Sequence, residues 1–291
     1  MSINVYEILE KYNLELIGQV SNPKISGPSS LDNQRKDGLY WIKNQKHVQF
    51  INKGFFIVNK NFKILKPNNV VLLVTTESPK LIYSKILKEF FTPSISFYLR
   101  NDVEKHRQNS QIIISSNVFI GLNVVIGSGT VLYPNTVIEA NTVIGEKCII
   151  KSHVSLGTEG LGLEWDSNLD NLVKFPQIGN VVLEDNITIG PNSTVRRGSL
   201  SSTIIKSGSH IGSLVNIGHN CKIDSNCILS CNIVTGGSSQ VGKNSFLGMG
   251  TIIKNGVLIG DNCQIGMGSI VNKDIPSNST AFGQPAVLKT S

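Results

Sequence analysis

A six-residue repeat of branched aliphatic residues limits what this chain can fold into. The first run consists of Ile114, Ile120, Ile126, Leu132, Ile138, Ile144, Ile150 and Leu156. The second run consists of Ile205, Ile211, Ile217, Ile223, Leu229, Val241, Leu247, Ile253, Ile259, Ile265 and Val271, with Thr235 as its polar exception. An α-helix needs spacings of three and four residues, and an ordinary strand alternates with period two. A fixed six-residue period instead indicates a hexapeptide β-helix.

In such a solenoid each hexapeptide supplies one short strand and one turn, and three hexapeptides make one triangular coil. Residues eighteen apart are therefore expected to lie above one another. We predict a mainly β protein, in which a left-handed parallel β-helix follows a small α/β domain. Four cysteines fall two residues before an aliphatic position, where small buried side chains are expected: Cys148, Cys221, Cys227 and Cys263. Cys231 is out of phase, and we assign it no role.

The domain boundaries follow from where the repeat starts and stops. Residues 1–108 lack it and are predicted to form the α/β domain, with a linker at 101–110. The β-helix is expected over 109–275, with a loop insertion at 157–177 and a tail at 276–291. Before the coils, helices are expected at Val5–Tyr12 and from Ser78 and strands at Gly54–Val58 and Val70–Val74.

The insertion is polar and contains Pro176 and glycines that the repeat cannot accommodate. Insertions in solenoids often lie on a binding face. Four of its carboxylates could serve acid–base chemistry or could simply be solvated: Glu159, Glu164, Asp166 and Asp170. Of these we retain Glu159 as a candidate substrate contact.

The overall composition narrows the partners. The formal net charge is +7, which fits either a mildly basic surface or an anionic ligand. There is no dense Lys/Arg stripe, so we expect no nucleic-acid partner. No apolar run is long enough for a membrane span, and no signal peptide is visible, so we expect a cytoplasmic protein. No set of three histidines has the spacing of a zinc site, and we expect no metal.

His219 is the strongest candidate for a general base. It lies two residues after Ile217, which predicts a position at a corner of the coil, pointing outward. Gly237 follows eighteen residues later and should leave open space and an accessible N–H directly above the imidazole. Histidine is the natural base near neutral pH. The alternative is an ordinary surface histidine.

The segment WIKNQKH places two rings and one amide at three-residue steps, at Trp41, Asn44 and His47. Rings can sandwich a nucleobase while an amide reads its polar edge. The alternative is a buried tryptophan beside two surface residues.

The chain resembles the UDP-3-O-acylglucosamine N-acyltransferases of the lipid A pathway and related nucleotide-sugar N-acyltransferases. The matching segments are SGPSSL, DGLYWIKNQKH, GTEGLGLE, KFPQIGNVVLEDNITIGPNST, the RG of RRGSL, and NIGHN. The resemblance implies that His219 is the general base and that the Gly237 N–H binds the oxyanion. It makes Trp41, Asn44 and His47 candidate nucleobase contacts. We count Asn220, the last residue of NIGHN, among the candidate substrate contacts.

The implied activity is transfer of an acyl group from a coenzyme A or acyl-carrier thioester to the amino group of a nucleotide-linked sugar. The class is usually homotrimeric. The C-terminal end resembles that of coenzyme A-dependent hexapeptide enzymes, which favours a role in O-antigen or capsule synthesis. The lipid A enzyme itself, with an acyl carrier protein as donor, stays an alternative. A non-catalytic nucleotide-sugar-binding β-helical trimer is the alternative from another class.

Overall fold

The computed structural model describes residues 2–20, 22–31, 33–62 and 69–289. The chain divides into two compact units. The first contains residues 1–93 together with 161–176, and the second contains residues 94–160 together with 177–291. Residues 161–176 of the predicted insertion at 157–177 thus belong with the N-terminal unit, while the two ends of the insertion and residues 94–108 belong with the coils.

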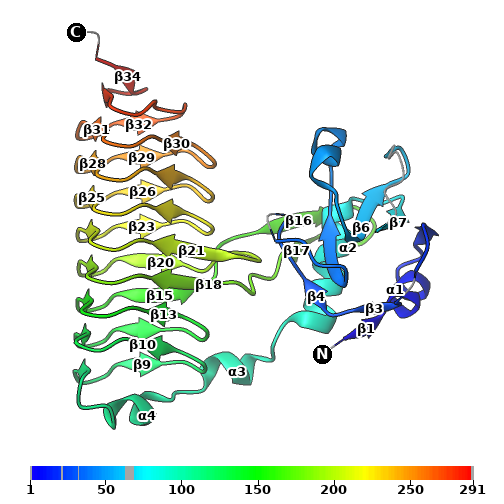
Figure 1. Cartoon of the computed structure of the whole chain (residues 1–291), viewed down its shortest axis with the longest axis horizontal. Coiled ribbons are helices and arrows are strands. Elements are labelled where there is room, and N and C mark those ends of the chain that lie inside the picture. Colours follow the sequence, from blue (N-terminus) through cyan, green and yellow to red (C-terminus); the bar gives the residue numbers. More distant parts are fainter. Residues whose placement is uncertain (1, 21, 32, 63–68, 290–291) are drawn as a thin grey trace. The chain divides into compact units, whose positions relative to one another are not determined.

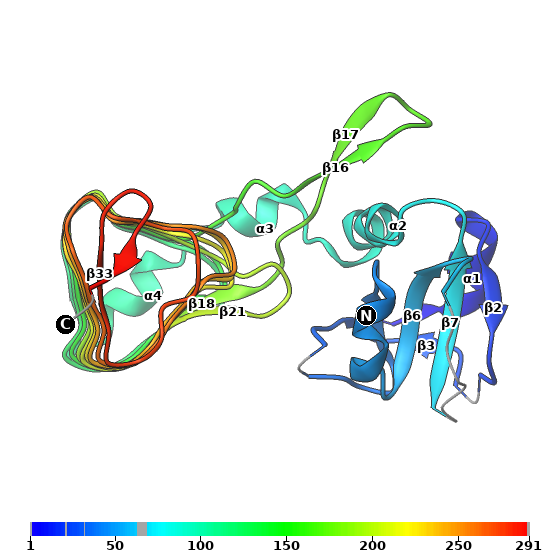
Figure 2. The same cartoon turned by 90° about the horizontal axis from the view of Figure 1, so that it is seen from above.

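The second unit is a parallel β-helix. Figure 1 shows its coils stacked one on another from green to red, and in Figure 2 they superpose into a single outline when viewed along the stack. Strand partners are eighteen residues apart in the regular coils, for example Val131 with Ile149 and Ile228 with Phe246. This is the register that the six-residue period predicts.

Among the described residues the coils form three faces, which we number in the order in which the chain reaches them. Face 1 contains β8 (Ile113–Ile114), β11 (Val131–Leu132), β14 (Ile149–Ile150), β19 (Thr188–Ile189), β22 (His210–Ile211), β25 (Ile228–Leu229), β28 (Phe246–Leu247), β31 (Gln264–Ile265), β33 (Thr280–Phe282) and β34 (Val287–Leu288). Face 2 contains β9 (Phe119–Ile120), β12 (Val137–Ile138), β15 (Ser155–Thr158), β20 (Thr194–Arg196), β23 (Asn216–Ile217), β26 (Val234–Thr235), β29 (Ile252–Ile253) and β32 (Ile270–Val271). Face 3 contains β10 (Val125–Ile126), β13 (Val143–Ile144), β18 (Asn180–Leu183), β21 (Ser202–Ile205), β24 (Lys222–Ile223), β27 (Gln240–Val241) and β30 (Leu258–Ile259).

The repeated aliphatic residues form one continuous core inside the coils. Ile120, Ile217 and Ile259 are fully buried, as are the four in-phase cysteines. At the corners the chain turns through residues with positive φ, most of which are asparagines. Asparagine tolerates this conformation better than most residues because its short side chain bonds locally. The small inward position and the corner asparagine together set the six-residue period.

Both ends of the β-helix carry added elements. Helix α4 (Val103–Arg107) lies within the segment expected to be a linker, and its Val103 packs into the core of the coils. The helix α3 (Ile95–Leu99) precedes it. Within the segment expected to be a tail, β33 continues face 1 by pairing with β31, and β34 pairs with β33.

The first unit is built on a mixed sheet in the order β2-β7-β6-β5-β4. Its strands are β2 (Glu15–Ile17), β4 (Gly27–Pro28), β5 (Gly38–Trp41), β6 (Gly54–Asn59) and β7 (Val70–Thr75), and β1 (Ile3–Asn4) pairs separately with β3 (Lys24–Ile25). Its helical segments are α1 (Val5–Lys11), the 3-10 helix η1 (Gln45–Phe50), α2 (Pro79–Ile86) and the π-helix η2 (Leu87–Phe91). The predicted helices and strands of this region are therefore present, with ends shifted by one or two residues.

The insertion forms an antiparallel hairpin of β16 (Leu163–Asp166) and β17 (Asn171–Lys174) that packs on α2. Lys80 forms an ion pair with Glu164, and the Nζ of Lys85 lies 2.8 Å from the Oδ2 of the buried Asp166. The ring of Phe175 stacks on that of Tyr83. In the described ranges no helix has the length and apolar character that crossing a membrane requires.

Candidate active site

His219 lies at the corner between faces 2 and 3, immediately after β23. The turn is made by Asn220, whose φ is +59°. The imidazole is half-buried. The preceding Gly218 N–H donates to the hydroxyl of Thr235 at 2.9 Å. The corner is therefore held to the next coil on the side of the core.

The amide of Asn220 has a defined orientation. The backbone N–H of Ser199 donates to its Oδ1 at 3.0 Å, and its Nδ2 donates to the hydroxyl of Ser201 at 2.9 Å. The Asn220 N–H donates to the hydroxyl of Thr203 at 2.8 Å. A backbone N–H can only donate, so the atom facing Ser199 is the amide oxygen.

That orientation fixes the tautomer of His219. Its Nδ1 lies 2.9 Å from the Oδ1 of Asn220. An amide oxygen can only accept, so Nδ1 carries the proton and Nε2 has the free lone pair. The hydroxyl of Ser199 lies 3.5 Å from the same Nδ1. The basic nitrogen of the neutral ring is thus the one that points away from Asn220.

Gly237 lies one coil above His219. A Cβ added to Gly237 would lie 2.5 Å from Nε2 and 2.7 Å from Cε1 of the imidazole. Real Cβ atoms do not approach so closely, so the imidazole occupies the space that glycine leaves. The His219 carbonyl accepts the Ser238 N–H at 2.7 Å. Within the described residues, no acceptor is paired with the Gly237 N–H. Gly237 is itself buried, so the expectation of open space above the imidazole is wrong, because the ring fills it. The corner therefore combines an imidazole lone pair with a neighbouring amide that has no acceptor among the described residues.

On the inner side of this corner a polar side chain occupies a position of the repeat that is otherwise aliphatic. Thr235 is 3% exposed, although it occupies an inward position of the repeat. Its hydroxyl accepts the Gly218 N–H and lies 3.3 Å from the Sγ of Cys221. That sulfur also lies 3.3 Å from the Ser239 hydroxyl. The break in the aliphatic series thus has a physical reason, because it satisfies the backbone next to His219.

Arg197 is the largest fully buried side chain of the chain's described part. Its guanidinium donates to the carbonyls of Gly157 and Ala140 and pairs with the carboxylate of Glu139 at 3.3 Å. The ring of Tyr98 lies 5.1 Å from its Cζ. Sequence reasoning did not single out this residue for a role, although it belongs to the RRGSL segment, where extra residues lengthen the step between two faces.

The acidic residues of the insertion are either paired within their own unit or exposed. Glu164 and Asp166 are paired with the lysines of α2, and Asp170 is exposed. Glu159 is exposed as well. Burial raises the pKa of Tyr98, the Arg197 charge opposes that shift, and the Glu159 carboxylate adds to it. Glu159 is therefore near Tyr98 in the second unit.

The predicted nucleobase contacts belong to the first unit. Trp41 ends β5 with a half-buried ring, and the Nζ of Lys80 lies 5.9 Å from the ring centroid. Asn44 is exposed and precedes η1. The side chain of His47 lies outside the described residues.

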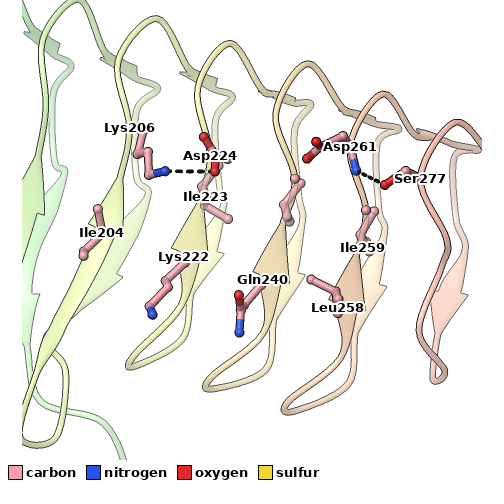
Figure 3. A pocket seen from close by; sticks show the side chains of 13 residues that line it. Ile204, Lys206, Lys222, Ile223, Asp224, Gln240, Leu258, Ile259, Asp261 and Ser277 are labelled. Carbon is pink, nitrogen blue, oxygen red and sulfur yellow. Dashed lines mark hydrogen bonds and ion pairs between the residues drawn. The ribbon is translucent and has the colours of Figure 1, made fainter. Parts of the chain in front are cut away.

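A groove of about 400 Å³ runs across the outer side of face 3. In Figure 3, Lys222 and Gln240 extend from successive strands, and the Lys206 ammonium meets the Asp224 carboxylate at 2.9 Å. Of the described residues, neither His219 nor Gly237 lines this groove. No three His, Cys, Asp or Glu side chains gather as metal ligands within the same ranges.

Comparison with known proteins identifies the repeat. The model of the family described as bacterial transferase hexapeptide (six repeats) matches residues 123–158 and 238–273. Both matched segments lie in the coils of the β-helix and together make up about a quarter of the chain. The solved structure of a Francisella novicida UDP-N-acetylglucosamine acyltransferase is 23% identical and covers 62% of this chain and 67% of that one, with a TM-score of 0.54. The predicted fold class, a left-handed parallel β-helix behind a small α/β domain, is confirmed.

Curated relatives match part of this chain. A UDP-3-O-acylglucosamine N-acyltransferase of Methylobacterium nodulans is 29% identical over 142 residues, 49% of this chain and 40% of that protein. The enzyme of the same name from Polynucleobacter asymbioticus is 44% identical over 78 residues, 26% of this chain and 22% of that protein. The chain therefore aligns with less than half the length of these relatives.

Proposed function

We propose that the protein is an acyltransferase that moves an acyl group from a thioester to the amino group of a nucleotide-linked amino sugar. The observation that carries this proposal is that the His219 Nε2 lone pair lies beside Gly237, whose N–H has no acceptor among the described residues. Acyl transfer needs a base for the attacking amine and a donor for the oxyanion that forms. The names of the curated relatives support the same reaction class.

The reaction assigned to this corner is addition of the amine to the thioester carbonyl followed by loss of the thiol. Nε2 of His219 accepts a proton from the amine as its nitrogen attacks the thioester carbonyl carbon. The carbonyl oxygen gains the negative charge and accepts a hydrogen bond from the Gly237 N–H. The tetrahedral intermediate then collapses, the C–S bond breaks, and the imidazolium gives its proton to the leaving sulfur. The products are an amide and a free thiol, and no oxidant or metal is required.

The donor and the acceptor belong to the same proposal. We assign the donor to the class of coenzyme A or acyl-carrier thioesters, and the acceptor to sugars that carry a nucleoside diphosphate. The net charge of +7 suits phosphate-bearing ligands. We also propose a homotrimer, cytoplasmic location and a part in cell-surface polysaccharide synthesis. The names of the relatives favour a second candidate, acylation of UDP-3-O-acylglucosamine in the lipid A pathway.

A donor panel tests the activity. The purified protein is incubated with amino-sugar nucleotides and with acetyl-, hydroxybutyryl- and hydroxymyristoyl-thioesters on coenzyme A and on acyl carrier protein. Mass spectrometry should detect an N-acylated sugar nucleotide with one equivalent of free thiol. Product from only the long carrier-bound donor would select the lipid A reaction. Tight sugar-nucleotide binding without product from any donor would contradict the enzyme and support a non-catalytic binding protein.

Nucleobase binding by the first unit is tested separately. Replacing Trp41 with Ala removes a ring on which a base can stack, and one stacked base contributes about 1–3 kcal/mol. The dissociation constant of the sugar nucleotide should therefore rise by about 5- to 150-fold. Trp165 is also a tryptophan of this unit and is 55% exposed on the hairpin. Trp165→Ala should leave the constant unchanged, and equal effects of the two variants would remove Trp41 from the binding site.

A further inference from the structure

We propose that Asn220 is a positioning residue, and that the irregular loop of residues 197–201 serves to hold it. This inference rests on the proposed function. The NIGHN motif suggested that Asn220 contacts the substrate. In this inference it does not. It accepts the Nδ1 proton of His219 and so presents Nε2 beside Gly237.

The side chain of Asn220 already uses most of its hydrogen-bonding capacity. Its Oδ1 receives the Ser199 N–H at 3.0 Å and faces Nδ1 of His219 at 2.9 Å, while Nδ2 is bonded to Ser201. An amide oxygen has two lone pairs, and both are occupied here. One Nδ2 proton is left over, which is too little to recognise a substrate. The side chain is therefore committed to the corner itself.

The eighteen-residue register is interrupted between β20 and β23. The regular spacing would put strand partners of β20 and β23 eighteen residues apart, but Thr194 pairs with Asn216, twenty-two residues on. The extra residues form the loop that supplies the Ser199 N–H and the Ser201 hydroxyl. Gly198 lies beneath Asn220, where an added Cβ would be 3.0 Å from Nδ2. The irregularity thus supplies hydrogen-bond partners that a regular coil does not have at this position.

The loop of residues 197–201 is anchored at its start. Arg197 begins it with a fully buried side chain that binds two carbonyls and the Glu139 carboxylate. Its own N–H donates to the Thr158 carbonyl at 2.9 Å, and the next N–H, of Gly198, donates to Asn180 at 3.1 Å. Because this end of the loop is fixed, Ser199 has a defined position. Asn220 bonds to Ser199, and the imidazole faces Asn220, so both are held in turn.

The test reads the tautomer directly. Nitrogen-15 NMR of protein labelled at histidine reports which ring nitrogen carries the proton, and the His219 signals are assigned by their loss in His219→Ala. We expect the Nδ1–H tautomer in the unmodified protein. Asn220→Gly keeps the positive φ without strain but removes the acceptor, so that tautomer should lose its dominance. Asn226→Gly, at a corner with φ of +57°, is the matched control and should change nothing at His219.

Kinetics separate positioning from substrate contact. In Asn220→Gly we expect kcat to fall by about 10- to 100-fold, the loss typical when an outer partner of a functional histidine is removed. The KM values of both substrates should stay within about twofold, because no binding contact is lost. Asn220→Asp keeps an acceptor at the same place and should retain the Nδ1–H tautomer even where the glycine variant folds poorly.

Two results would overturn the inference. A dominant Nδ1–H tautomer in folded Asn220→Gly would show that Asn220 does not hold the ring. A large rise in the sugar KM with unchanged kcat would make Asn220 a substrate contact. The NMR measurement requires no substrate, so it decides the positioning role even when the donor panel yields no acylated product and the proposed function fails.

Discussion

Two corners of the same β-helix use one repeat position in different ways. Asn220 and Asn226 are successive corner asparagines with nearly equal φ values, +59° and +57°. The Asn226 amide donates to Asn244, Asn244 donates to Asn262 at 3.1 Å, and Asn262 donates to Asn278 at 2.9 Å. The Asn220 amide instead bonds to Ser199, Ser201 and His219. Asn226 therefore belongs to a column of asparagines that are hydrogen-bonded from coil to coil, and Asn220 does not. We call the corner at Asn226 the structural corner.

The neighbours of the two asparagines also differ in whether their backbone amides are hydrogen-bonded. Ser225 stands at the position of His219, and Lys243 stands at the position of Gly237. The Lys243 N–H donates to the Asp261 carboxylate at 3.1 Å, so the structural corner satisfies its amide from the next coil. The corresponding Gly237 N–H has no acceptor among the described residues. A corner thus becomes a candidate site when it leaves unpaired what the other corners pair.

The largest effect on activity should come from removing the imidazole. His219→Ala deletes the proposed base, and kcat should fall by about 10² to 10⁴ with little change in thermal stability. Ser225→Ala makes the matched change at the structural corner and should keep near-normal turnover. The comparison fails if steady-state kinetics show similar rates for the two variants.

The next largest effect should come from filling the space beside the imidazole. Gly237→Ala adds a Cβ at 2.5 Å from Nε2 and must displace the ring or the backbone. Loss of an aligned oxyanion donor costs about 10²–10³ in kcat, and we expect a loss in this range. The control is Gly256→Ala, because nothing lies within 4 Å of a Cβ there, although its φ of +73° adds some strain. Unimpaired kcat in Gly237→Ala would separate this amide from the chemistry.

Placing a carboxylate at each of the two corners tests the contact between Asn220 and His219. In Asn220→Asp, a carboxylate faces the imidazole and stabilises its protonated form. The base then becomes available only at higher pH, so the acid limb of the kcat/KM profile should move upward by about one pH unit. Asn226→Asp places the same charge at the structural corner and should leave the limb in place. Equal profiles for both variants would contradict the Asn220–His219 contact.

The smallest effect on activity is expected from the hairpin of the first unit. The Lys85 ammonium lowers the pKa of Asp166 in the folded protein. A lowered pKa stabilises the fold above the unfolded carboxyl value of about 3.9, and that contribution is lost as the pH falls through the folded pKa. Asp166→Asn should therefore lower the urea midpoint at pH 7, and the difference from the unmodified protein should shrink as the pH falls below the unfolded value. Exposed Asp170 provides the control Asp170→Asn, and a deficit that stays constant as the pH is lowered would refute the ion-pair explanation.

Much of the fold follows from the sequence because the repeat is periodic. A branched residue every six positions, a small residue two before it and a corner asparagine set strand, core and turn locally, and the eighteen-residue register follows from three such units per coil. The N-terminal helices α1 and α2 also follow from local patterns. The hairpin β16–β17 does not, because long-range pairing of Glu164 and Asp166 with α2 stabilises it.

The candidate site is predictable only in part. The His219–Gly237 pairing follows from the eighteen-residue spacing. The role of Asn220 does not, because its partners Ser199 and Ser201 lie in the loop where the period breaks. Two irregularities mark it, the extra residues after Val195 and the polar Thr235 in an aliphatic series. Departures from a strong repeat are the sequence signal that best marks this corner.

The most direct measurement is an experimental structure with an unreactive thioether analogue of the acyl donor and a nucleotide amino sugar. The account predicts that the analogue's carbonyl oxygen lies about 2.7–3.1 Å from the Gly237 amide nitrogen, with the sugar amine in hydrogen-bond reach of Nε2 of His219. Both ligands bound with the His219 corner empty would contradict it.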